Sequence, residues 1–72
     1  MFSKVMEYSL KKNGFKLNGA YYQKFEREIE YRCYSTKTNT FLIAIDENGR
    51  RNNELAQKEM NKLERTIAKL YD

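Results

Sequence analysis

Residues 21–35 read YYQKFEREIEYRCYS, and this stretch decides the fold because two kinds of side chain alternate along it. The apolar and aromatic members occupy odd positions: Tyr21, Phe25, Ile29, Tyr31 and Cys33. The charged members occupy even positions: Lys24, Glu26, Glu28, Glu30 and Arg32. Successive side chains of a strand point to opposite faces. The pattern therefore predicts β-structure with the odd positions in the core and the even positions in solvent.

A helix also fits the same stretch, since Tyr21, Phe25 and Ile29 are spaced by four and glutamate favours helices. The many aromatic residues favour a strand. We expect β-structure here, and the alternatives of one long strand, two strands or a helix stay open at this point.

The residues before this stretch predict a helix from Ser3 to Lys12, with apolar side chains at helical spacing. Ser3 is a suitable N-cap for that helix. Gly14 suits the left-handed position that ends a helix, and Phe15 can then fold back on Leu10.

The remaining segments complete the expected order. Asn18-Gly19 favours a two-residue type I′ turn, and residues 41–45 (FLIAI) predict a buried strand at the centre of the sheet. Asn52 or Asn53 is expected to cap a helix that runs to about Tyr71. Its apolar face consists of Ala56, Met60, Leu63, Ile67 and Leu70. We predict one small α+β domain over residues 1–72, in the order α-β-β-β-α, with both helices on one face of a three-stranded antiparallel sheet.

Composition limits the chemistry that the 72 residues can perform. There is no histidine and a single cysteine, which excludes an intrachain disulfide and the zinc sites built from Cys and His. Cys33 falls on the predicted core face, where a thiol is usually inert packing. We therefore expect a protein that is not an enzyme and uses no cofactor or metal.

The location of the protein is also predicted from composition. No apolar run approaches the length of a membrane span, and charged residues interrupt the first ten positions, unlike a signal peptide. With its lone thiol, the chain is expected to be soluble and cytoplasmic, with no membrane partner.

The predicted polar face of residues 21–35 is the first candidate binding surface. Its members are Tyr22, Lys24, Glu26, Glu28, Glu30, Arg32 and Tyr34. The row of three glutamates would meet a basic partner protein. A divalent cation held with Asp46 or Glu47 is less favoured, because no loop spacing of a calcium site is present. Among the aromatic residues, Tyr22 and Tyr34 are expected to point outward, and Tyr21, Phe25, Tyr31 and Phe41 to lie in the core.

Direct binding of DNA or RNA is the alternative function. The net charge is +4, and the candidate cations are Lys11, Lys12, Lys37, Arg50, Arg51, Lys58 and Lys62. Stacking of bases on Tyr22 or Tyr34 would accompany these phosphate contacts.

Two resemblances are confined to topology. The order α-β-β-β-α resembles double-stranded-RNA-binding domains, with Lys58 and Lys62 in the region that this family uses for phosphates. The basic run that opens the second helix of that family is replaced here by Asn52-Asn53-Glu54-Leu55-Ala56. The segment from Tyr31 to Arg51, followed by a helix, is loosely similar to the arm-binding domains of phage integrases.

In size, lone cysteine and lack of chemistry, the chain resembles the small accessory proteins of phages and mobile elements, many of which block host defence systems such as CRISPR effectors. This likeness implies an inhibitor or regulator of the anti-defence, anti-CRISPR-like kind. Its partner would be a nucleic-acid-handling host protein or a protein–nucleic acid complex. We expect the protein itself to be a monomer or a homodimer.

Overall fold

Residues 21–35 form two strands that are joined by a tight turn. The computed structural model describes all residues from 1 to 72. Strand β2 (Tyr21–Glu26) pairs in antiparallel fashion with β3 (Ile29–Ser35). Arg27 and Glu28 between them have positive φ angles of 50° and 65°. Positive φ at both central residues is what a type I′ hairpin turn requires, and Asn-Gly or Asp-Gly is the usual sequence there. The turn therefore carries no familiar sequence signature.

This turn changes which positions face the core: the even positions before it and the odd positions after it. Glu26 pairs with Ile29 across it, so even positions of β2 share a face with odd positions of β3. Tyr22 is consequently buried, and Phe25 is 70% exposed. The predicted core positions of Tyr21 and Phe25 and the predicted outward position of Tyr22 are therefore wrong. Of the three core positions predicted in the second half of the stretch, Tyr31 and Cys33 are buried, and Ile29 is half-buried and packed against the core.

The sheet has four strands where three were predicted. The extra strand is β1 (Lys16–Asn18), which pairs with β2 through a loop of Gly19 and Ala20. Only Gly19 in that loop has a positive φ, of 63°, as in a type II′ turn with glycine first. The loop is therefore displaced by one residue from the predicted Asn18-Gly19 turn.

Strand β4 (Thr40–Ile45) lies at the edge of the sheet, whose order is β1-β2-β3-β4. The predicted central position of residues 41–45 is wrong, because each strand simply pairs with the next along the chain. Phe41, predicted to lie in the core, is 39% exposed on this edge strand. A single bridge between Ile45 and Arg51 continues the pairing beyond β4.

The two helices and their caps agree with the local sequence signals. In α1 (Lys4–Lys12), the Oγ of Ser3 accepts a hydrogen bond of 3.1 Å from the amide of Met6. In α2 (Asn53–Lys69), the side chain of Asn52 accepts one of 3.0 Å from the amide of Leu55. The predicted caps are confirmed, and α2 ends two residues before the predicted Tyr71.

The end of α1 also follows the prediction. Gly14 has a φ of 89°, and the amide of Phe15 donates a hydrogen bond of 2.9 Å to the carbonyl of Leu10. The left-handed glycine lets the chain reverse, so that Phe15 enters the core beside Leu10. The helix and the first strand are thereby joined by a short corner at Gly14 and Phe15.

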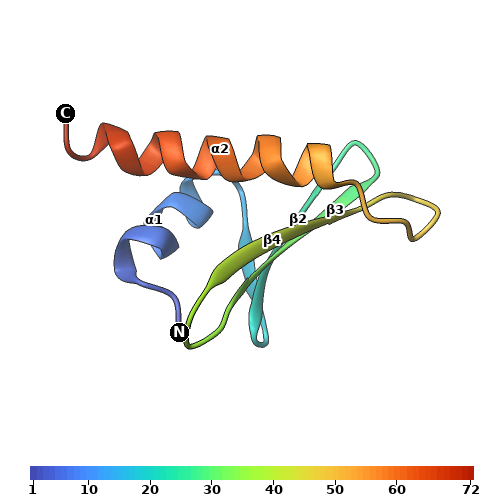
Figure 1. The fold of residues 1–72 in the computed structure, drawn as a ribbon, viewed down its shortest axis with the longest axis horizontal. Helices are drawn as coiled ribbons and strands as arrows, with labels where there is room; N and C mark the ends of the chain where they lie inside the picture. The colour runs from blue at the N-terminus through green and yellow to red at the C-terminus, as the bar shows by residue number, and fades with distance from the viewer.

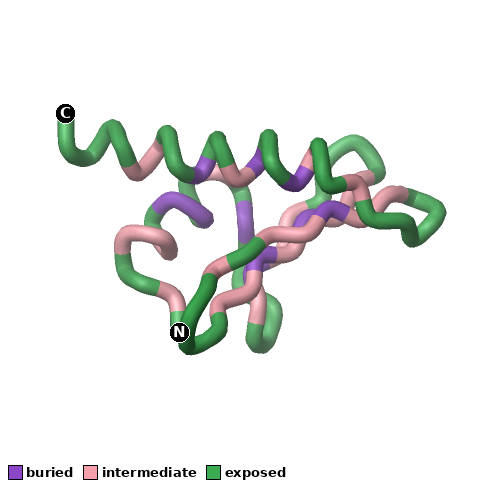
Figure 2. Tube along the Cα trace, viewed as in Figure 1, coloured by how far each residue is buried: buried purple, intermediate pink, exposed green.

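Both helices cover the same face of the sheet, as predicted, with α2 lying along it and α1 beside α2 (Figure 1). The buried residues lie between these two layers (Figure 2). They comprise Leu10, Phe15, Tyr22, Tyr31, Cys33, Ala44, Ala56 and Leu63. The Oγ of Ser9 donates a 2.7 Å hydrogen bond to the carbonyl of Leu63, which ties α1 to α2. Neither helix is long and apolar enough to cross a lipid bilayer.

Candidate binding surface

The face of the sheet opposite the helices, called here the open face, presents side chains from all four strands. Register places these side chains in cross-strand rows. The members of the open face are Lys16, Asn18, Tyr21, Gln23, Phe25, Glu30, Arg32, Tyr34, Phe41, Ile43, Ile45 and Arg51. The other face is packed against α1 and α2 and is called the covered face.

Three aromatic rings form a continuous row on the open face. The ring centroids of Tyr21 and Tyr34 are 5.1 Å apart, and those of Tyr34 and Phe41 are 5.3 Å apart with the planes inclined by 18°. Each ring comes from a different strand, from β2, β3 and β4. Aromatic pairs at this separation stabilise one another. The row is thus an ordered apolar strip across the sheet.

A neutralised arginine lies beside this row. Arg32 makes contacts of 2.6 Å from Nε and 3.2 Å from Nη2 to the two carboxylate oxygens of Glu30. Its guanidinium carbon is 5.2 Å from the ring centroid of Tyr21. The hydrogen bonds from Arg32, with one from Gln23, lower the pKa of the Glu30 carboxyl, and the bond to Glu30 raises the pKa of Arg32. The centre of the open face therefore carries a matched ion pair and no free charge.

The structure divides the seven residues predicted to bind a protein. Glu30, Arg32 and Tyr34 lie together on the open face. The remaining four do not join them: Tyr22, Lys24 and Glu26 are on the covered face and Glu28 is in the turn. The predicted row of three glutamates on one side is therefore wrong, because the turn at Arg27 and Glu28 reverses the alternation between Glu26 and Glu30.

Tyr22 is a structural residue of the covered face. Its ring packs edge-on against Phe2 at a centroid distance of 5.0 Å, and its hydroxyl donates to Glu7 Oε2 at 3.4 Å. Burial, with the nearby Glu7 carboxylate, raises the pKa of this phenol. The ring of Tyr22 is therefore inaccessible to the base stacking that was predicted for it. Tyr34 is on the open face and points away from the core, as predicted.

Lys24 and Glu59 form an ion pair between the sheet and α2. The Nζ of Lys24 donates to the carboxylate of Glu59, which is 2% exposed. The same Nζ is 5.1 Å from the ring centroid of Phe15 and 5.3 Å from that of Tyr31. Sequence reasoning missed Glu59, although it lies three residues after Ala56 and four before Leu63, on the core side of the helix.

The seven cations predicted for nucleic-acid binding are all exposed but do not gather on one surface. Lys58 and Lys62 lie one turn apart on α2, and Arg51 lies at the margin of the open face opposite Ile45. The others lie at separate places: Lys11 and Lys12 at the end of α1, Lys37 between β3 and β4, and Arg50 in the loop before α2.

The reactive groups of the chain are few. Cys33 is completely buried, and burial raises the pKa of its thiol to about 11. The thiol is therefore protonated at neutral pH, and a substrate cannot reach it. No three side chains of His, Cys, Asp or Glu lie close enough together to hold a metal ion.

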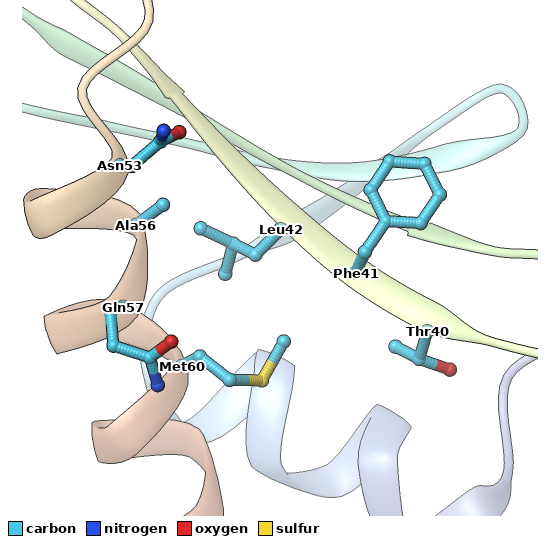
Figure 3. A pocket seen from close by; sticks show the side chains of 7 residues that line it. All are labelled: Thr40, Phe41, Leu42, Asn53, Ala56, Gln57 and Met60. Carbon is cyan, nitrogen blue, oxygen red and sulfur yellow. The ribbon is translucent and has the colours of Figure 1, made fainter.

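A groove of about 340 Å³ lies between the edge strand β4 and α2 (Figure 3). Figure 3 shows Leu42 turned toward Ala56 and Met60, while Phe41 points to the other side of β4. The lining residues are Thr40, Phe41, Leu42, Asn53, Ala56, Gln57 and Met60. The groove thus meets the aromatic row at Phe41.

No protein-family model, curated protein or solved structure matches the chain.

Proposed function

We propose that this chain is a non-enzymatic protein that binds another protein through its open face. The observation that carries this proposal is the row of Tyr21, Tyr34 and Phe41, with the neutralised Arg32, on a sheet face that no helix covers. Centres of protein interfaces are enriched in aromatic residues and arginine and depleted in free charges. Large uncovered apolar patches on small proteins commonly mark such interfaces.

The margins of the open face indicate the charge of the partner. Lys16 on β1 and Arg51 after β4 flank the face on opposite sides, and both are exposed. Cations around an apolar centre favour a partner surface with an acidic margin. An inhibitor or regulator of a nucleic-acid-handling host protein, the partner class expected from the sequence, would use this face to contact that protein.

A pair of matched double variants tests the proposal. Tyr34→Ala/Phe41→Ala removes two rings from the open face, and Tyr8→Ala/Tyr71→Ala removes two exposed rings elsewhere. Each tagged protein is used to capture partners from nuclease-treated extract of its host cell, and the affinity for the captured protein is then measured with purified components. Truncation of one interface hot spot costs about 2 kcal/mol or more, which is roughly a 30-fold loss of affinity. We expect at least that loss for the open-face variant and none for the control.

Two results would contradict the proposal. One is capture of the same protein with equal affinity by both variants while thermal melts show that both remain folded. The other is a concentration-dependent dimer in sedimentation that only the open-face variant abolishes, because a second copy would then occupy the face.

A further inference from the structure

Four cations form a stripe along the exposed side of α2. Lys58, Lys62, Arg65 and Lys69 are spaced by four, three and four residues, which places them on one side of a helix. All four are exposed. They span eleven residue steps, or about 16 Å along the helix axis.

The stripe is not neutralised by its own chain. Each pair of neighbours is a like-charged pair at i,i+3 or i,i+4, which costs about 0.2–0.5 kcal/mol of helix stability. Within 4.0 Å of the four cations there is one carboxylate, Glu59, at 3.8 Å from Lys62. That carboxylate is already bound by Lys24. The helix therefore carries a repulsion that an anionic partner would relieve.

A hollow beside α2 adds a fifth cation. The hollow, of about 410 Å³, lies between the β2–β3 turn and α2 and brings Arg27 to Lys58 and Lys62. Its two carboxylates are Glu26 and Glu59, and both lie within 4.0 Å of Lys24. Lys24 offsets one of these two negative charges, so the three cations, the two carboxylates and Lys24 together carry a net charge of +2. Arg27, Lys58, Lys62, Arg65 and Lys69 are together called the basic stripe.

We infer that the basic stripe binds the sugar-phosphate backbone of double-stranded nucleic acid. The four α2 members of the stripe follow one another at intervals of about 4.5–6 Å along the helix axis. A duplex laid across the helix can therefore place phosphates of its backbone against several of them. No aromatic residue lies between its α2 members, so it lacks the anchors typical of a protein interface.

The inference goes beyond the proposed function because it concerns another surface. Figure 1 shows α2, which carries four of the five cations, on one side of the sheet, and the aromatic row belongs to the opposite, open face. A protein partner and a nucleic acid would therefore bind together without competing, as in a protein–nucleic acid complex. Of the cations predicted from sequence, only Lys58 and Lys62 belong to the stripe.

Fluorescence anisotropy with a labelled DNA duplex of about 20 base pairs tests the inference, with salt varied between about 50 and 200 mM. Phosphate contacts by the four α2 members of the stripe give a slope of about −3.6 for the logarithm of affinity against the logarithm of salt concentration, or a roughly 150-fold loss over this range. Lys62→Gln/Arg65→Gln should make that slope shallower by about 1.8. The control Lys37→Gln/Arg50→Gln removes the same net charge from two loops and should leave the slope unchanged.

Any of three outcomes would overturn the inference. The first is no binding at the lowest salt concentration, and the second is an equal change of slope in both variants, which would reflect net charge alone. The third is poly-glutamate binding as tightly as the duplex, which would assign the stripe to an acidic protein. The capture experiment uses nuclease-treated extract and open-face variants, so each surface can fail its test while the other passes.

Discussion

Each face of the sheet carries a cation that is paired with a glutamate and lies over an aromatic ring, and the two pairs have different roles. On the covered face, Lys24 is held by Glu59 and lies over aromatic rings. On the open face, Arg32 is held by Glu30 and lies over the ring of Tyr21. The first pair joins β2 to α2 and is nearly sealed from water, whereas both members of the second belong to β3. One pair ties two layers together, and the other holds an arginine in place on a surface.

Burial decides how each pair contributes to stability. A buried ion pair adds little net stability, because desolvation offsets attraction, but removal of one partner is costly. A partly exposed pair contributes about 1 kcal/mol or less in either case. Matching substitutions on the two faces should therefore differ by several-fold in effect.

The largest effect is expected from Lys24→Met, which leaves the Glu59 carboxylate buried without its main partner. We expect a loss of about 3 kcal/mol or more in the free energy of unfolding, measured by urea denaturation. The double variant Lys24→Met/Glu59→Leu removes both charges and should recover most of this loss. Equal losses in the single and double variants would show that the side-chain packing matters and the ion pair does not.

A smaller effect, of opposite sign, is expected at the turn that separates the two faces. Arg27→Asn/Glu28→Gly replaces two residues at positive φ by the pair best suited to a type I′ turn. Relief of left-handed strain should add about 1–2 kcal/mol, or a rise of several degrees in melting temperature.

The same substitution also tests the division of residues between the faces. A lower melting temperature, with Tyr22 becoming accessible to solvent, would indicate another turn and another register. The control Glu47→Gly places a glycine in a loop position with no positive φ and should not be stabilising.

The smallest effect is expected from Glu30→Gln on the open face. Since Arg32 lowers the pKa of Glu30 below its ordinary value of 4.5, the stabilisation is present above 4.5 and is lost as pH falls through the lowered value. The variant should be less stable than wild type by about 1 kcal/mol or less at pH 7. Denaturation across the acid range should show the two curves converging. A constant difference in stability between the two proteins at every pH would contradict the role of the Glu30 charge. Glu64→Gln serves as the control, because Glu64 is exposed and forms no ion pair.

The sequence predicted correctly which side chains lie together where their positions depend on a single helix or strand. Tyr34, Glu30 and Arg32 were correctly grouped because all three lie on β3. Lys58 and Lys62 were correctly paired because one helical turn separates them. Arg27 could not be joined to them, since the hollow that unites them forms only when the β2–β3 turn packs beside α2.

The sequence by itself determined the two helices, their caps and the reversal at Gly14, because each depends on hydrogen bonds and backbone angles within a few residues. For residues 21–35 it favoured β-structure and left a helix open, and the structure decided for two strands. Only the tertiary structure decided which side chains of β2 face the core. The backbone strain of the turn at Arg27 and Glu28 is offset by the pairing of β2 with β3 along their whole length. Glu59 is buried because Lys24 approaches it from a strand that is distant in the sequence. These interactions are non-local, and no short window of sequence contains them.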